Sequence, residues 1–137
     1  MKKLIIILIF SFTTLFASEI NTASKIMEKI SSALIQKSEI SIFTNDSKNI
    51  KILESSKKLK NVLSCEESDL VLTKTKINSF CKKKVLVFAT NYLAFVKSPD
   101  AIGAFFYQKG RPNIIFREEN LKKHNIILPK EFEKYIE

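Results

Sequence analysis

The chain of 137 residues has the length of one domain, and its 45% hydrophobic and 27% charged residues are typical of a globular protein. These values exclude a disordered tail and a multidomain enzyme. The formal net charge of +9, from 23 Lys and Arg against 14 Asp and Glu, makes nucleic acid, an anionic membrane surface and an acidic protein the candidate partners. Residues for catalysis are scarce, since the chain has one His and two Cys.

Residues 1–17 have the pattern of a secretory signal peptide. Lys2 and Lys3 precede an apolar stretch of about a dozen residues, which is short of the ~20 needed to span a bilayer. We therefore expect cleavage after Ala17 or Ser18 rather than a retained anchor, and export to a bacterial periplasm. The mature domain, residues 18–137, loses two of the 23 cations and keeps 21 against 14 anions, a net charge of +7.

The two cysteines, Cys65 and Cys81, are an even count in a chain predicted to be exported. This favours a disulfide over two free thiols, because the periplasm is oxidising. Such a bridge stabilises a small domain by about 3 kcal/mol in the chain-entropy account. A redox pair would need closer cysteines, and a zinc site would need more ligands than one histidine supplies.

The first half of the mature chain begins with a predicted helix at Asn21–Lys37, where apolar residues recur every three or four positions. Alternating residues predict a strand at Glu39–Phe43, which the polar turn at 44–47 ends. The pattern at Ile50–Leu53 fits two structures. It is either a short second strand or the start of a helix that continues through residues 59–63.

The middle of the chain contains two apolar runs that are typical of strands buried on both faces, Asp69–Thr73 and Lys84–Thr90. Between them, Lys74–Phe80 has the composition of one or two helical turns. A loop or short helix is expected at Asn91–Asp100. Continuous apolar strands separated by helical stretches predict a parallel sheet covered by helices.

The last third predicts a hairpin, with strands at Ala104–Tyr107 and Asn113–Phe116 joined by the turn residues Gln108–Pro112. A helix follows at Glu118–Lys123, and a last helix begins at Pro129. The expected fold is therefore α/β: a small three-layer domain with a mostly parallel sheet and a C-terminal β-hairpin.

The chain offers little for catalysis or metal binding. Two isolated glycines exclude a phosphate-binding loop, and His124 lies at a helix end without a neighbouring nucleophile. The acidic residues Glu66, Glu67 and Asp69 lack the spacing of a calcium loop. We expect a protein that is not an enzyme and has no cofactor and no metal.

The lysines are spread over three separate clusters, at 57–60, 82–84 and 122–123, without a nucleic-acid-binding motif. Lysine also lacks the bidentate geometry of arginine for reading bases. We therefore expect solvated lysines and no nucleic-acid partner.

Polar residues follow two predicted strands at their carboxyl ends. Asn45 and Asp46 come after the first strand, and Asn91 and Tyr92 come after the strand at Lys84–Thr90. Ligands of parallel sheets bind at this edge, so these four residues are the candidates for a ligand pocket. A small periplasmic solute-binding protein is accordingly one of the two functions that we consider.

The C-terminal third resembles the end of the YfiR/HmsC family of periplasmic proteins. The resemblance covers Gly103–Arg117, continues through Leu121–Leu128 and includes Phe132 and Tyr135–Ile136. In that family a glycine opens a strand, a glycine-basic turn leads into a second strand, and a basic helix ends before a last helix. Asn125 stands where the family has a glycine, and asparagine tolerates the left-handed conformation.

The resemblance implies a non-enzymatic α/β regulator that binds an inner-membrane signalling protein, of the diguanylate cyclase or sensor-kinase type. It makes Tyr107, Arg111 and Arg117 of the hairpin the candidate partner-binding residues. Aromatic side chains there serve as interface anchors, with Phe105 assigned to the core. A homodimer remains open, and no membrane insertion is expected after signal cleavage.

Overall fold

The computed structural model describes residues 19–75, 81 and 83–137. The predicted signal peptide, residues 1–17, lies outside this part of the chain, as do residues 76–80 of the predicted helical turns. Within the described residues, no helix combines the length and the apolar character needed to cross a membrane.

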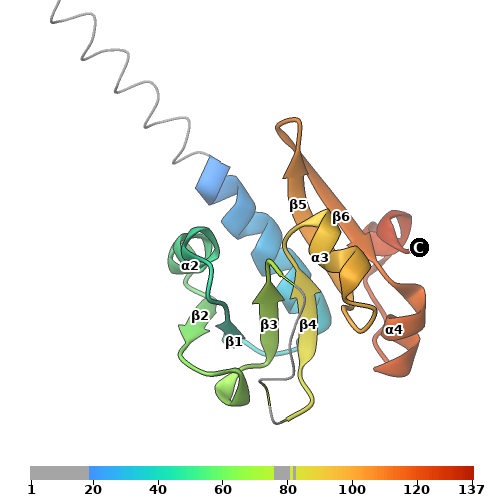
Figure 1. The fold of residues 1–137 in the computed structure, drawn as a ribbon, viewed down its shortest axis with the longest axis horizontal. Helices are drawn as coiled ribbons and strands as arrows, with labels where there is room; N and C mark the ends of the chain where they lie inside the picture. Colours follow the sequence, from blue (N-terminus) through green and yellow to red (C-terminus); the bar gives the residue numbers. More distant parts are fainter. Residues whose placement is uncertain (1–18, 76–80, 82) are drawn as a thin grey trace, which may run out of the picture.

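A six-stranded sheet forms the centre of the molecule (Figure 1). Its strands are β1 (Ile40–Phe43), β2 (Leu59–Val62), β3 (Leu70–Thr73), β4 (Leu86–Ala89), β5 (Gly103–Gln108) and β6 (Arg111–Phe116). They lie in the order β2-β1-β3-β4-β5-β6. The neighbours from β2 to β5 are parallel, and β5 and β6 form an antiparallel hairpin. The predicted α/β class, the mostly parallel sheet and the C-terminal hairpin are confirmed.

Helices connect the strands and cover the sheet. Residues 19–34 are helical, so the predicted N-terminal helix is present and ends three residues early. The other helical elements are α2 (Ser47–Glu54), α3 (Tyr92–Lys97), α4 (Glu118–Lys123) and the 3-10 helices η1 (Cys65–Glu67) and η2 (Lys130–Tyr135). Of the loop or short helix expected at Asn91–Asp100, the structure forms the helix α3, and the helix expected from Pro129 is the 3-10 helix η2.

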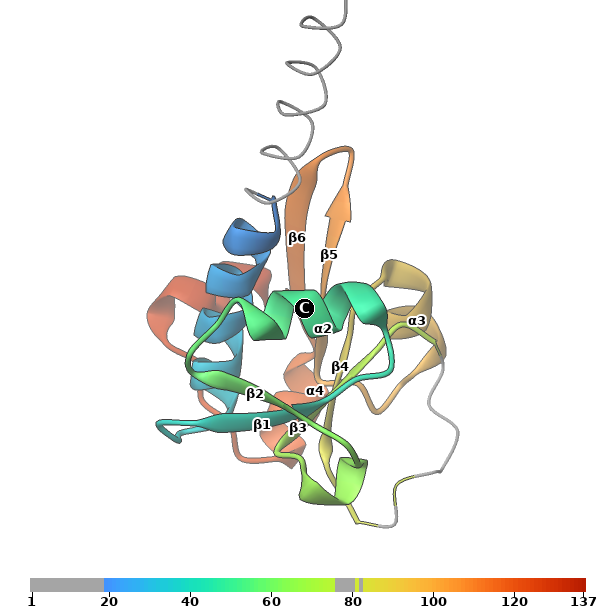
Figure 2. The ribbon, with the colours of Figure 1, turned by 90° about the vertical axis from the view of Figure 1, so that its left-hand side faces the viewer.

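The two faces of the sheet have separate cores, which makes three layers. Leu86 and Phe88 of β4 pack with the helix at residues 19–34 and with α2, while Val87 and Ala89 pack with α3. This division follows from the alternation of side chains along a strand. Figure 2 shows residues 19–34 on one side of β4 and α3 on the other.

The segment 59–63 departs from prediction, because the helix at Ile50–Leu53 does not continue into it. The helix ends at Glu54, and the hydroxyl of Ser56 then accepts hydrogen bonds from the backbone N–H groups of Lys58 and Leu59. The chain turns there and pairs with β1 as strand β2. Pairing with a distant strand therefore overrides the local preference for helix.

Two turns use the left-handed backbone that their residues tolerate. Lys109 and Gly110, with φ of 52° and 73°, join β5 to β6 as a type I′ turn requires. Asn125, with φ of 55°, ends the turn that follows α4, and asparagine is one of the few residues other than glycine that tolerate this conformation.

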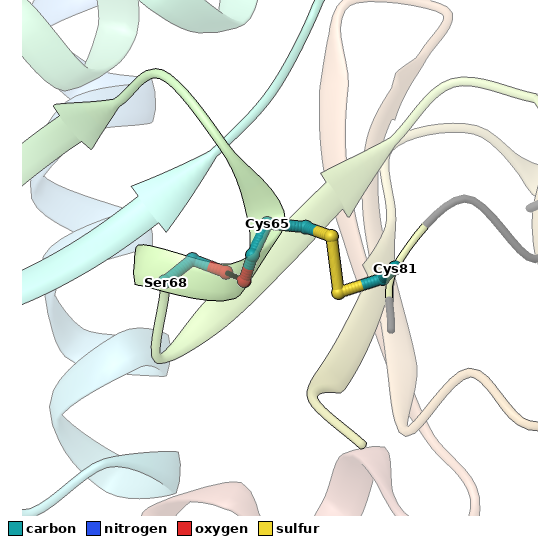
Figure 3. Close-up of a disulfide and its surroundings, with 3 residues drawn as sticks. All are labelled: Cys65, Ser68 and Cys81. Atoms are coloured by element: carbon teal, nitrogen blue, oxygen red, sulfur yellow. Dashed lines mark hydrogen bonds between the residues drawn. A yellow bond between two sulfur atoms is a disulfide. The ribbon is translucent and has the colours of Figure 1, made fainter. Parts of the chain in front are cut away.

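A disulfide joins Cys65 in η1 to Cys81 ahead of β4, with 5.7 Å between the Cα atoms (Figure 3). The hydroxyl of Ser68 donates a 2.7 Å hydrogen bond to the carbonyl of Cys65 and closes η1. The predicted bridge is confirmed. It ties the chain before β3 to the chain before β4, and a loop of 16 residues corresponds to about 3 kcal/mol.

Candidate functional site

A cavity of about 440 Å³ opens at the carboxyl ends of the parallel strands. From β1 the chain moves to β2, toward one edge of the sheet. From β3 it moves to β4 and β5, toward the other edge, so the two directions diverge between β1 and β3. Ligands of open α/β sheets bind in the crevice where connections diverge in this way. We call this cavity the strand-end cavity; it is lined by Met27, Asp46, Lys48, Asn49, Ile52, Lys74, Thr90, Asn91, Tyr92 and residues 105–108.

The polar wall of the strand-end cavity is built by α2. Asp46 caps the helix, since its carboxylate accepts a 3.1 Å hydrogen bond from the backbone N–H of Asn49. The buried side-chain amide of Asn49 donates to the hydroxyl of Thr90, at 3.3 Å, and so connects α2 to the end of β4. Lys74 lies 3.4 Å from the Asp46 carboxylate. The sequence patterns considered above do not predict a role for Asn49. Its position three residues after Asp46, a residue type that caps helices, would have placed it in the first turn of a helix.

Three of the four predicted pocket residues line the strand-end cavity. Asp46, Asn91 and Tyr92 do so, whereas Asn45 does not. Asn91 caps α3, because its side-chain oxygen accepts a 2.7 Å hydrogen bond from the backbone N–H of Ala94. Both capping residues thus hold a helix start at the edge of the cavity.

The hairpin supplies the aromatic wall. Phe105 is buried, as expected, and Tyr107 on the same face of β5 lies beside it with 5.6 Å between the ring centroids. The Tyr107 hydroxyl oxygen is enclosed and has no hydrogen-bond partner among the described residues. Burial, together with the carboxylate of Glu19, raises the pKa of Tyr107 above its usual value of 10.0.

The short helix α3 exposes an apolar surface. Tyr92, Leu93 and Val96 are 58%, 61% and 52% exposed, and their spacing places them on one face of the helix. The ring of Tyr92 lies 6.1 Å from that of Phe106 in β5. We call these four residues the α3 patch. The β5–β6 tip extends past the parallel strands in both views of the molecule (Figures 1 and 2).

The two arginines occupy different environments. Arg111 is exposed at the hairpin tip. The Arg117 guanidinium lies 3.9 Å from the centre of the Phe95 ring and donates to the carbonyl of Phe95 at 2.7 Å. It also donates to the carbonyls of Ser98 and Ala101, at 2.8 and 3.0 Å. Arg117 therefore acts as an internal clamp on the end of α3. Of the three predicted partner-binding residues, Tyr107 packs beside Phe105 with its hydroxyl enclosed, and Arg111 is the exposed one.

The residues considered for catalysis lie apart. His124 is exposed at the end of α4, as expected from its position in the sequence. Asp69 pairs with Lys37 at 2.7 Å. The described residues bring one group of possible metal ligands together, Cys65, Glu66 and Cys81, and both sulfurs of this group form the disulfide.

Comparisons with known proteins give no relative for this chain. No family model matches it. Neither the search of curated proteins nor the search of solved structures finds a significant match.

Proposed function

We propose that the protein is a non-enzymatic periplasmic regulator that binds the exported part of an inner-membrane signalling protein, of the diguanylate cyclase or sensor-kinase type. The α3 patch is the observation that carries this proposal. Monomeric proteins seldom gather several large apolar side chains on one short exposed helix, and such patches are typical of protein interfaces. The resemblance of the C-terminal third supports the class of partner.

The surroundings of the α3 patch fit an acidic partner. Lys97 ends α3, Lys109 lies in the turn of the neighbouring hairpin, and Arg111 follows that turn. An interface with an aromatic centre and a charged rim uses the centre for affinity and the rim for orientation and rate of association. Tyr92 is the side chain that best fits the anchor, because it is large and already packed against Phe106.

The test compares two double variants that remove the same kind of apolar surface. Leu93→Ser with Val96→Ser alters the α3 patch. Leu63→Ser with Ile127→Ser is the matched control, since these side chains are 92% and 91% exposed and lie outside the patch. The tagged proteins are used to capture membrane proteins from detergent extracts, and the captured proteins are identified by mass spectrometry.

We expect the wild type and the control to retain a membrane signalling protein, and the patch variant to lose it by roughly tenfold or more, as for two interface anchors. Equal retention by both variants, or no signalling protein in any capture, would refute the proposal. Urea denaturation of each variant shows that the loss does not come from unfolding.

The strand-end cavity favours a second candidate function, the binding of a small polar solute. It brings Asp46, Asn49 and Thr90 together with an unpartnered Tyr107 hydroxyl. A thermal-shift screen of small polar molecules tests it. A ligand that stabilises the wild type but not Asn49→Ala or Tyr107→Phe supports this function, and the absence of any stabilising ligand contradicts it.

A further inference from the structure

A second cavity, of about 560 Å³, lies at the opposite end of the sheet from the strand-end cavity. Its floor consists of Val71 of β3, Val85 immediately before β4, and Val87 of β4. Alternation along β3 and β4 turns these valines away from the core that contains Leu70 and Phe88. We call this site the valine-floored cavity.

The rim of the valine-floored cavity is strongly basic. Lys83 and Lys84 come from the chain before β4, Lys97 comes from the end of α3, and Lys123 comes from the end of α4. Asp100 is the one carboxylate among the lining residues. Within the described part of the chain, none of the four lysines forms an ion pair. Charges of one sign around a concave apolar surface concentrate a positive potential, which attracts anions.

The walls are held in place by interactions that do not involve a ligand. The buried amide of Asn120 donates to the carbonyls of Pro99 and Ala101, at 2.7 and 2.9 Å, and fixes the loop after α3. Cys81 lines the cavity, so the disulfide anchors the chain that carries the first two lysines. A wall fixed before binding lowers the entropy that a ligand must lose.

One polar group of this wall lacks a partner. Ser98 lines the cavity and is 7% exposed, and its hydroxyl oxygen has no hydrogen-bond partner among the described residues. Buried hydroxyl groups are almost always hydrogen-bonded, because an unpaired polar group away from water is destabilising. This oxygen is enclosed by protein atoms, so the lysines of the rim, and not Ser98, are the groups that meet an anion in the cavity.

We propose that the valine-floored cavity binds a small amphiphilic organic anion, a carboxylate with an aliphatic chain. The lysines receive the carboxylate, and the valines receive the chain. An inorganic anion leaves the apolar floor unused, and an uncharged chain leaves the lysines unpaired. The proposal is tested on the isolated protein, so its outcome does not depend on the proposed partner.

The experiment titrates octanoate into protein with labelled valine methyl groups and follows their NMR signals. The chain has five valines, and Val62 and Val96 lie outside the cavity, so they are internal controls. We expect saturable shifts for the three floor valines and none for the two controls. Octanol and inorganic phosphate, measured in the same way, are expected to bind at least about tenfold more weakly, since each offers half of the required chemistry.

Two double variants with equal loss of charge test the role of the rim. Lys97→Gln with Lys123→Gln removes two rim lysines, and Lys51→Gln with Lys60→Gln removes two exposed lysines that do not line the cavity. We expect the rim variant to bind octanoate about five- to tenfold more weakly, the sum of two partly exposed ion pairs, and the control to bind nearly as tightly as the wild type. Lys84→Gln is a second rim variant, for use if the first does not fold.

Three results would overturn the proposal. If octanol binds as tightly as octanoate, the negative charge of the ligand does not contribute to binding. If phosphate binds as tightly, the aliphatic chain does not contribute. Equal weakening in the rim and control variants assigns the attraction to net charge alone.

Discussion

Replacement of Arg117 tests how the C-terminal end of α3 is attached to the rest of the domain. Its guanidinium donates to carbonyls of Phe95, Ser98 and Ala101 and lies against the Phe95 ring. Replacement by Met keeps the length of the side chain but removes every donor. The carbonyls then lose a charged partner that lies 16 to 22 residues away in the sequence. This partner attaches the end of α3 to the junction of β6 and α4.

The expected cost follows from these contacts. A hydrogen bond to a charged group contributes about 1.5–3 kcal/mol when it is buried, and partial exposure reduces this to about 1 kcal/mol for each of the three bonds. The stacking on Phe95 adds about 0.5 kcal/mol. We therefore expect Arg117→Met to lower the free energy of unfolding by about 3.5 kcal/mol, which corresponds to about 2 M in the urea midpoint.

Arg111→Met is the matched control, since Arg111 is the other arginine of the chain and lies exposed at the hairpin tip. We expect it to change the free energy of unfolding by less than about 0.5 kcal/mol. Arg117→Lys keeps the charge but not the planar set of donors, and an intermediate loss is expected. Equal urea midpoints for Arg117→Met and Arg111→Met would show that the clamp contributes nothing to stability.

Three further changes have defined outcomes. Replacing Cys65 and Cys81 by Ser should cost about 3 kcal/mol in urea denaturation and abolish the effect of reductant on the wild-type curve. Gly103→Ala should cost at least about 2 kcal/mol in the same assay, because the new Cβ overlaps a backbone oxygen of β6; a neutral effect would mean that the hairpin shifts freely. Burial alone raises the pKa of Asp69, but hydrogen bonds from Lys37 and from the Ser41 backbone outweigh it and lower the pKa below 3.8. Asp69 therefore stabilises the fold above pH ~4, and this contribution is lost as the pH falls through the lowered pKa, so acid titrations should show a smaller loss for Asp69→Asn than for the wild type.

The two cavities and the α3 patch share one structural element. α3 starts at the strand-end cavity with Tyr92, exposes the patch along its length, and ends at the valine-floored cavity with Lys97. A ligand at either end therefore touches the helix that we propose to bind a partner. The Arg117 clamp connects this helix to the rest of the sheet, so its loss is expected to weaken partner capture through the position of α3.

Local sequence determined the elements whose signals are contained in a few neighbouring residues. The continuous apolar runs in β3 and β4 predicted strands buried on both faces. β3 is buried throughout, whereas β4 is buried at Phe88 and Ala89 and half-buried at Leu86 and Val87. The turn residues before Pro112 predicted the hairpin, and Asn125 was expected to tolerate the left-handed backbone that it adopts. The even count of cysteines, together with the predicted export, favoured a disulfide over two free thiols, and the structure contains the disulfide.

Tertiary structure alone decided the features that depend on distant partners. Segment 59–62 is a strand because it pairs with β1. The periodicity of its own residues does not predict a pairing partner elsewhere in the chain. The sequence around Arg111 and Arg117 did not predict their different roles. Arg117 is an internal clamp because its acceptors lie in and after α3, whereas Arg111 is exposed at the hairpin tip. Lysines that are scattered in the sequence met around one apolar floor, because the packing of α3 and α4 against the sheet, and not the spacing of the residues, sets the distances between them.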